Sequence, residues 1–410
     1  MSEWKEYRLG DIYDVHNGLS KGGKFFGSGY PFLTFSEVFN NYFIPSKLSS
    51  LVQSTDRERL VCNILAGDIF VTRTSETANE LGMSCVALKD YPNATYNGFT
   101  KRLRKKENCK VDVDSRFIGY FLRSRKFRSL FYGISGGMST RASLANNDLL
   151  NMVITLPSFP EQEKIGEILK KIDDKIAVNR RICENLEAQA QALFKHWFID
   201  FAPFKNGQFV ESELGMIPEG WRVGTLGEIA DINPSRTIKK GTISTYLDMK
   251  NMPTSGSFPI NWEDKEFVGG MKFKNGDTLM ARITPCLENG KVAYVNFLKD
   301  GEIGFGSTEY IVMTAKESIF PEFLYTLCRF PSFVNYAVKN MNGSSGRQRV
   351  SGETISNFIM VIAPQSVYSS VRPLFQEYML RIRECGFENL RLSTLRDTLL
   401  PKLMSGQIKV

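Results

Sequence analysis

The feature that most constrains this chain is a long central run without helix breakers. From Glu161 to Phe198 it contains no proline, and its one glycine is Gly166. Apolar side chains recur in this run with heptad spacing and form a wide stripe among charged residues, the pattern of an amphipathic helix that packs against another helix. At 1.5 Å per residue, roughly 37 residues would span about 55 Å, longer than an ordinary domain helix. The run is therefore predicted to be a spacer, and the alternative is a core helix of one large domain.

A second stripe with the same spacing occurs near the C-terminus, although Gly386 weakens its middle. Two such stripes in one chain most simply bury each other, and antiparallel packing is the easier choice because each helix must return toward the next unit. Lys175 and Asn179 interrupt the first stripe and indicate a polar stretch. The residues predicted to form the helix pair, or to contact a partner docked on it, are Ile165, Ile168, Ile172, Ile176, Leu186, Leu193, Val371, Leu374, Tyr378, Leu392 and Leu399.

The rest of the chain repeats one plan twice. Trp4 and Trp221 each precede a Leu-Gly-acid-Ile segment by the same interval, and each copy has a Gly-Asp turn followed by a short apolar strand and an arginine. Between these landmarks, residues 19–60 of the first copy and residues 235–270 of the second cannot be convincingly aligned with each other. The predicted fold class is α+β, with two similar globular domains separated by two long antiparallel, coiled-coil-like helices in an internal pseudo-two-fold repeat. The predicted boundaries are a first domain at 1–158, a central helix at 159–199, a linker at 200–218, a second domain at 219–364 and a C-terminal helix at 365–410.

Composition places the chain among ordinary globular proteins, with 42% hydrophobic and 23% charged residues. No apolar run reaches the length of a bilayer span, and the seven cysteines are dispersed without a Cys-x-x-Cys pair. These features predict free thiols in a cytoplasmic protein without membrane contact. The net charge of +8 equals the net charge of residues 101–128 alone, which indicates either a solvated basic face or contact with phosphates.

The residues needed for most catalytic sites are missing from the sequence. With two histidines, a His/Cys metal centre or a Ser-His-Asp hydrolase is improbable, and no phosphate-binding glycine motif is present. Carboxylates such as Asp68, Glu76 and Glu80 could bind a hard metal ion, but the Gly-Asp context of Asp68 is more economically a turn. No catalytic residue and no metal site is therefore predicted.

The candidate DNA contacts are basic and hydroxyl side chains on a flexible loop, at strand ends, in the basic segment and in two Gly/Ser loops. Arginine at a strand end can reach a guanine edge, and a loop that combines amides, hydroxyls and guanidinium groups suits phosphates and base edges. A solvent-exposed loop without a ligand is the alternative for each. The predicted residues are Lys21, Lys24, Arg73, Thr74, Lys101, Arg102, Arg104, Ser139, Thr140, Arg141, Arg282, Thr284, Ser344, Ser345, Arg347 and Arg349.

Together these landmarks resemble the specificity subunit of type I restriction–modification systems. The resemblance rests on Ile217–Trp221 followed by Leu226–Ile229, on the two Gly-Asp…Arg strands and on the Gly/Ser-Arg loops. The most specific part is the sequence LPSFPEQEKI at 156–165, which looks like the family's proline-Glu-Gln entry into its conserved helix. The C-terminal copy departs from this pattern, because residues 363–367 lack the Glu-Gln pair.

The resemblance implies two target-recognition domains that each read half of a split DNA sequence, with the helices fixing the length of the unread spacer. It implies a non-catalytic subunit that binds no cofactor itself. Its expected partners are double-stranded DNA, two methyltransferase subunits that use S-adenosylmethionine, and restriction/translocase subunits that use ATP and magnesium. Two alternatives are a standalone metal-dependent nuclease using Asp68 and Asp277, and a coiled-coil scaffold whose domains bind protein.

Overall fold

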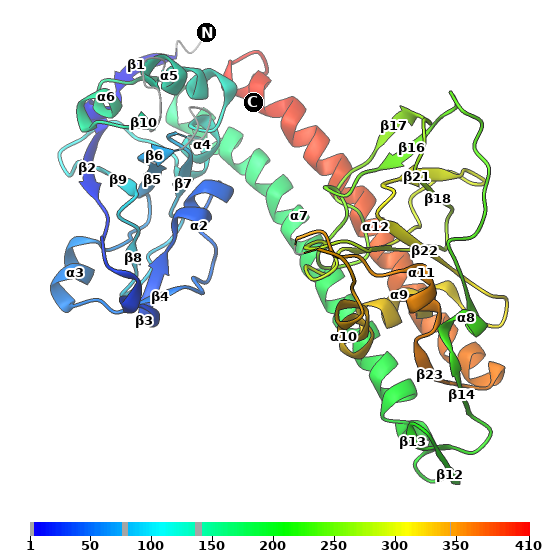
Figure 1. Ribbon diagram of the computed structural model, residues 1–410. Coiled ribbons are helices and arrows are strands. Elements are labelled where there is room, and N and C mark those ends of the chain that lie inside the picture. The colour runs from blue at the N-terminus through cyan, green and yellow to red at the C-terminus, as the bar shows by residue number, and fades with distance from the viewer. Residues whose placement is uncertain (1–3, 76–80, 136–141, 345) are drawn as a thin grey trace. The chain divides into compact units, whose positions relative to one another are not determined.

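The computed structural model describes residues 4–75, 81–135, 142–344 and 346–410, which form two compact units. Unit 1 comprises Met1–Asp174 and Leu392–Val410, and unit 2 comprises Lys175–Arg391. Each unit therefore contains part of both long helices, α7 (Phe159–Phe194) and α12 (Gln365–Met404), which are labelled in Figure 1. Among the described residues, no helix is long and apolar enough to cross a membrane.

A four-stranded antiparallel sheet forms the centre of unit 1. The strands lie in the order β2 (Tyr13–Asn17), β9 (Thr100–Lys105), β5 (Ile69–Thr72) and β7 (Ser84–Val86). A second, three-stranded sheet has the order β4 (Leu51–Val52), β3 (Phe26–Leu33) and β8 (Thr95–Tyr96). Two short ladders complete the unit, β1 (Lys5–Arg8) with β11 (Val153–Leu156) and β6 (Thr74–Ser75) with β10 (Ala142–Ser143).

Both faces of the central sheet are covered. Successive side chains of a strand point to opposite faces, so alternate residues of β5 join different cores. Ile69 and Val71 of β5 join a core with α4 (Ser115–Phe121), whereas Phe70 joins a second core with the strands of the three-stranded sheet. All four β5 residues are buried. The remaining helices of unit 1 are α1 (Leu9–Ile12), α2 (Phe35–Asn40), α3 (Asp56–Val61), α5 (Arg125–Ser135) and α6 (Asn146–Leu150).

Unit 2 repeats the plan of the central sheet and of the ladder formed by β1 and β11. Its central sheet has the order β15 (Ala230–Ile232), β22 (Tyr310–Ala315), β19 (Thr278–Ala281) and β20 (Val292–Tyr294). β14 (Arg222–Thr225) pairs with β23 (Ile359–Ile362), as β1 pairs with β11. Its helices are α8 (Leu226–Ile229), α9 (Pro321–Arg329), α10 (Pro331–Lys339) and α11 (Gly352–Ser356). The predicted internal repeat is thus confirmed.

The two segments that could not be aligned in sequence also share a plan. In unit 1, β3 pairs in parallel with β8, the short strand that precedes β9. In unit 2, β16 (Ile243–Leu247) pairs in parallel with β21 (Gly304–Gly306), the short strand that precedes β22. β17 (Glu263–Glu266) pairs antiparallel with β16 as β4 does with β3, and unit 2 adds β18 (Met271–Phe273) beside β21. The inserted segments therefore differ in side chains and in length more than in topology.

The long helices begin and end close to where the heptad pattern predicts. α7 continues into a π-helical segment, Lys195–Ile199. Gly166 is required by close packing, since a Cβ there would lie 2.6 Å from Asp114 Oδ1, at the N-terminal end of α4. Gly386, which weakens the pattern of α12, has a similar role: a Cβ there would lie 2.4 Å from the Phe258 ring.

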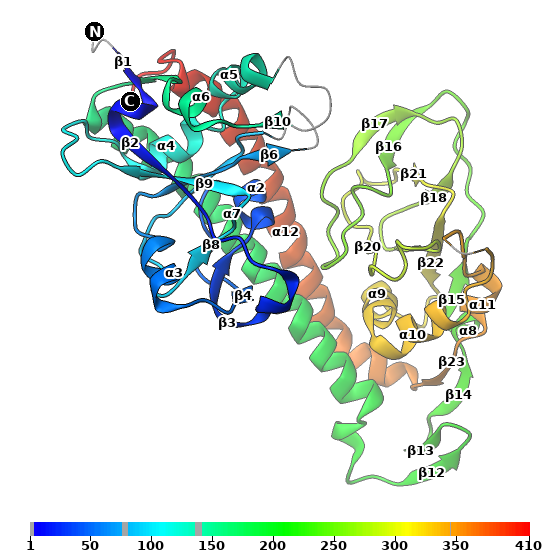
Figure 2. The ribbon, with the colours of Figure 1, turned by 60° about the vertical axis from the view of Figure 1, so that its left-hand side comes forward.

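Within each unit the two helices lie side by side and antiparallel, as the views in Figures 1 and 2 show. In unit 1, Arg396 donates to Asp173 across 2.8 Å. In unit 2, the Asn179 side chain is fully buried and donates to Glu388 across 2.7 Å and to Asn389 across 3.1 Å. The polar stretch predicted from Asn179 is therefore an amide network inside the helix pair.

Two of the predicted helix contacts are not buried. Ile168 is 37% exposed and Leu374 is 43% exposed. The stripe is wider than the seam that one helix can cover, so residues at its margin remain in solvent. The other predicted positions are buried (Ile165, Ile176, Val371) or half-buried (Ile172, Leu186, Leu193, Tyr378, Leu392, Leu399).

The predicted linker is ordered. Within 200–218, β12 (Phe209–Ser212) and β13 (Gly215–Pro218) form a hairpin that follows the 3-10 segment Ala202–Phe204. The rings of Phe201 and Phe204 each lie 5.2 Å from the Trp221 ring. Pro203 lies in the 3-10 segment, and Gly215 and Pro218 are the first and last residues of β13.

Candidate nucleic-acid interface

Each unit places an arginine directly after the central strand of its sheet. Arg73 follows β5 and Arg282 follows β19. The backbone N–H of Arg73 donates to the Phe99 carbonyl across 3.0 Å, and that of Arg282 donates to the Glu309 carbonyl across 3.0 Å. Among the residues that the structure describes, the buried Nε of each arginine has no hydrogen-bond partner. In each unit the backbone of the arginine is thus held in place, and its Nε–H makes no hydrogen bond to the described residues.

Described residues at the C-terminal ends of the predicted polar loops lie against these strand ends. In unit 2, Val350 N–H donates to the Arg282 carbonyl across 3.0 Å, and Thr284 N–H donates to the Gln348 carbonyl across 3.1 Å. In unit 1, Leu144 N–H donates to the Arg73 carbonyl across 2.8 Å, and Thr74 pairs with Ser143. Four predicted residues, Ser139, Thr140, Arg141 and Ser345, lie outside the described residues.

In unit 2 the loop presents two arginines in different states. Arg347 is exposed, as is Ser344, and its guanidinium has no hydrogen-bond partner in the described part of the chain. Arg349 donates through Nε to both oxygens of Glu309, across 3.0 and 2.9 Å, and through Nη2 to Oε1 across 2.7 Å. Arg282 Nε lies 3.9 Å from the same carboxylate. The hydrogen bond from Arg349 lowers the pKa of Glu309, so the carboxylate is charged at neutral pH.

Unit 1 has a different residue at the position of Glu309. The turn before β9 carries Phe99, whose side chain is 58% exposed, and Arg73 therefore has no carboxylate in the equivalent place. Lys101 is buried beside it and its Nζ donates to Asn146 Oδ1. Burial, followed by the nearby Arg73 charge, lowers the pKa of Lys101. Arg73 and Lys101 are thus two neighbouring cations, and among the described residues Asp148 is the carboxylate that acts on Lys101.

Two other basic residues of β9 are engaged inside the unit. Arg102 is 3% exposed and donates through Nη1 to the Asn63 carbonyl across 2.6 Å. Arg104 binds Asp68 through Nε and Nη2, across 2.7 and 2.6 Å. These contacts give both arginines a structural role within unit 1, and DNA contact stays a prediction for them.

The glycine-rich loop carries the remaining predicted cations. Lys21 donates to the Gln53 carbonyl across 2.7 Å and forms an ion pair with Glu58 at 2.8 Å. Lys24 is exposed and lies over the Phe25 ring at 5.2 Å from its centroid. Of these two lysines, Lys24 is the one available to a phosphate.

The carboxylates of the nuclease alternative are internal ion pairs. Asp277 is fully buried, with Arg236 Nη1 2.6 Å from its Oδ2 and Thr314 Oγ1 donating to its Oδ1 across 2.6 Å. Asp68 is 1% exposed and is held by Arg104. Burial raises the pKa of Asp277. No group of three or more His, Cys, Asp or Glu side chains suited to a metal ion occurs among the described residues.

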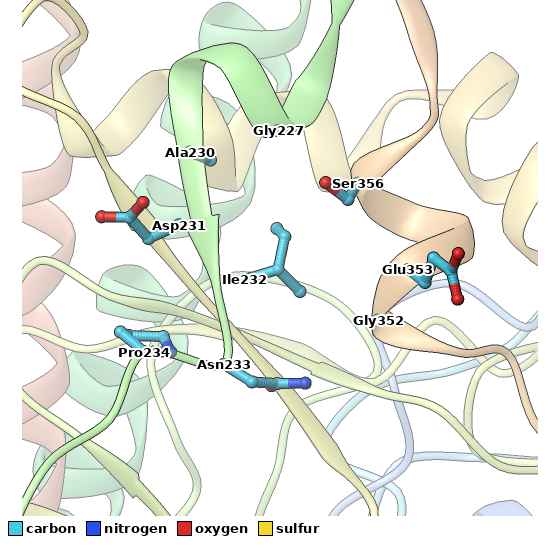
Figure 3. A pocket seen from close by; sticks show the side chains of 9 residues that line it. All are labelled: Gly227, Ala230, Asp231, Ile232, Asn233, Pro234, Gly352, Glu353 and Ser356. Atoms are coloured by element: carbon cyan, nitrogen blue, oxygen red, sulfur yellow. The ribbon is translucent and has the colours of Figure 1, made fainter.

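A hollow in unit 2 has a lining that includes neither of the strand-end arginines (Figure 3). It is bounded by β15 and the start of α11, and its charged side chains are Asp231 and Glu353. None of the predicted site residues lines it. A negatively charged hollow of this kind repels a phosphate backbone, so it is not part of the candidate interface.

Sequence reasoning missed Phe99 and Glu309, which differ most between the two units at this surface. Both are followed by the strand next to the arginine-bearing strand, β9 or β22, and their backbone carbonyls make the same hydrogen bond. Aligning these two strands in the sequence would have placed the two residues at one position. No charge or composition signal marks either of them.

Comparisons with known proteins agree on one family. The family described as "Type I restriction modification DNA specificity domain" matches residues 1–188. The chain is 26% identical to the type I restriction enzyme MjaIX specificity subunit of Methanocaldococcus jannaschii, over 100% of this chain and 94% of that protein. It is also 26% identical to the HindI specificity subunit of Haemophilus influenzae, over the full length of both. The fold is similar to a crystal structure of a type I restriction–modification S subunit from M. genitalium, with a TM-score of 0.56, 16% identity and coverage of 98% of this chain and 96% of that one.

Proposed function

We propose, since this chain belongs to the specificity subunits of type I restriction–modification systems, that its two units each read one half of a split sequence in double-stranded DNA. One observation carries the proposal: both units place a strand-end arginine, whose Nε makes no hydrogen bond to the described residues, beside a polar loop segment. The two units share one backbone scaffold but carry different side chains on it, as is expected of two domains that recognise different DNA sequences.

The chain is proposed to act without catalysing a reaction. Methyltransferase subunits and restriction/translocase subunits are the proposed partners, and S-adenosylmethionine, ATP and magnesium would be bound by them. The exposed apolar residues of the long helices, such as Ile168 and Leu374, offer contact area to such partners. The ion pairs of Asp68 and Asp277 make the nuclease alternative unattractive, because each buried carboxylate already has an arginine partner.

Binding of duplex DNA should depend strongly on salt. If six or more phosphates are contacted, the affinity of the chain with its modification subunit should fall by about a thousandfold between about 50 mM and about 200 mM salt. The measurement is a titration of labelled duplex followed by fluorescence anisotropy. Mapping methylated adenines in cells that carry the complex should in addition give a two-part motif with a fixed gap. Indifference to DNA at low salt would favour a protein scaffold, and cleavage by the chain with magnesium alone would favour a nuclease.

Arg73→Ala should weaken binding to a target duplex by about tenfold, the loss expected for one base-edge or phosphate contact. The reason is that Arg73 and Lys101 form the cationic pair next to the exposed Phe99. Arg125→Ala is the matched control, since Arg125 is exposed at the start of α5 in the same unit and loses the same charge. Equal effects of the two substitutions would show that only net charge matters and would contradict a role for the strand end.

A further inference from the structure

The turn before β9 in unit 1 and the turn before β22 in unit 2 carry different side chains, and this difference changes how an arginine can be used. Phe99 in unit 1 and Glu309 in unit 2 accept the same backbone hydrogen bond, from Arg73 and Arg282 respectively. Only Glu309 brings a carboxylate to this surface. A carboxylate next to a DNA-contacting surface repels phosphates, so its presence calls for a function that outweighs that repulsion.

The contacts of Glu309 point to such a function. It binds the Nε and Nη2 edge of Arg349 with three hydrogen bonds of 2.7 to 3.0 Å. Its own backbone N–H donates to Ser307 Oγ across 3.1 Å, which anchors the turn. The Arg349 side chain remains 40% exposed, and Nη1 has one further contact, with the Arg347 carbonyl at 3.2 Å. The guanidinium plane is thus fixed from one edge and from the loop backbone.

A guanidinium group held in this way still has its Nη1–Nη2 edge to offer. Guanine presents two acceptors, O6 and N7, in the major groove, and a bidentate arginine is the commonest specific contact to it. Fixing the plane beforehand removes rotamer entropy that binding would otherwise cost. A fixed guanidinium group also cannot turn toward a neighbouring phosphate, as the group of a flexible arginine side chain can.

Building on the proposed function, we propose that Arg349 reads a guanine in the half-site of unit 2 and that Glu309 is its positioning residue. Arg347, which is exposed and has no side-chain partner among the described residues, contacts phosphate instead. Unit 1 has Phe99 and Ser143 at the two equivalent positions and so lacks this pair. The two units therefore differ in how they read DNA as well as in what they read.

The test measures base preference and total affinity separately. The full-length chain, co-purified with its modification subunit, is allowed to bind a duplex library with randomised positions, and the bound fraction is sequenced. Arg349→Lys keeps the charge but cannot form the bidentate contact, so the preference for guanine at one base pair should fall by about tenfold or more. Glu309→Gln should reduce the preference at that same base pair, while total DNA retention rises because a negative charge is removed.

A merely structural role for Glu309 would lower preference and retention together, and a merely electrostatic role would raise retention without changing any preference. Either result overturns the inference, as does an unchanged preference in Arg349→Lys. Glu317→Gln is the matched control, because Glu317 is an exposed carboxylate of the same unit, and it should leave base preference unchanged. A wild-type complex that selects no split motif would overturn the proposed function itself, whereas a split motif that is unaffected in both variants would overturn only this inference.

Discussion

Replacing Arg236 by alanine should lower the free energy of unfolding of unit 2 by about 3–5 kcal/mol, the cost of leaving a buried charge without its partner. Asp277 is fully buried and the Arg236 side chain is 9% exposed. Arg236 also donates to Thr314 Oγ1 across 2.8 Å and to the Lys272 carbonyl across 3.1 Å. Chemical denaturation monitored by tryptophan fluorescence measures the loss.

The loss should depend on pH in a defined direction. Burial already raises the pKa of Asp277, and removing Arg236 removes a charge that lowers it. The folded variant then binds a proton more tightly than the unfolded chain, so its stability falls as pH rises through the raised pKa and is regained as pH falls. The deficit should therefore be larger at about pH 8 than at about pH 5.

Two further variants separate this mechanism from a general loss of packing. Adding Asp277→Asn to Arg236→Ala should recover part of the stability, since an amide is less costly than a carboxylate to bury without a cation. Arg180→Ala removes an exposed arginine from α7 in the same unit and should change stability by less than about 0.5 kcal/mol. A loss below about 1 kcal/mol in Arg236→Ala would mean that Asp277 is solvated or neutral in the folded chain.

Phe323→Ala is the second large effect and should cost about 3–5 kcal/mol in unit 2. The Phe323 ring is fully buried on α9, with its centroid 4.9 Å from that of Phe198 and 5.1 Å from that of Tyr368. It thereby joins the end of α7 to the start of α12 in this unit. For a unit of this size the melting temperature should fall by roughly 6–20 °C, which calorimetry can measure.

Leu374→Ala is the matched comparison on α12, because this side chain is 43% exposed although the heptad pattern predicts it at the helix pair. It should change stability by less than about 0.5 kcal/mol. A loss as large as that of Phe323→Ala would show that Leu374 is buried in solution. Together the two variants test which of these side chains is buried and how much its burial contributes to the free energy of unfolding.

The long helices and the internal repeat could be predicted because they depend on local patterns. Heptad spacing determines which helix face is apolar, and the Gly-Asp turns and Trp-Leu-Gly segments recur in the same order in both copies. The shared topology of the inserted sheets could not be predicted, because β3 and β16 are held by backbone hydrogen bonds that many side chains allow. The structural role of Arg123, which follows α4, and of its counterpart Arg329 could not be predicted either, because their hydrogen-bond partners are distant in the sequence.

These two arginines illustrate what residue type alone does not reveal. Arg123 donates to the carbonyls of Ser84 and Val38, across 2.6 and 2.7 Å. Arg329 donates to the carbonyls of Val292 and Thr254, across 2.7 and 2.8 Å. Both tie the central sheet to the inserted segment, although Arg123 belongs to the basic stretch whose charge indicates an external partner. Whether a cation faces inward depends on carbonyls that lie dozens of residues away in the chain.

The strand-end residues could be singled out from the sequence for a related reason, and their contact with DNA stays a prediction. Arg73, Arg282 and the Gly/Ser loops recur in both copies, and in unit 2 the structure places Arg282 next to loop residues Gln348 and Val350. The residues that distinguish the copies, Phe99 and Glu309, do not recur and carry no local signal. Differences between repeats therefore need a strand alignment before they can be seen.

The last residues of the chain complete the unit that begins it. Leu403 and Met404, at the end of α12, are 1% and 2% exposed and belong to the same core as Leu9 and Phe117. On the ribosome, that core stays open until α12 has emerged, so the half of the protein that is synthesised first is finished last. A nascent chain interrupted before α12 would present this unfilled apolar surface to chaperones and proteases, which makes synthesis of α12 a condition for a stable unit 1.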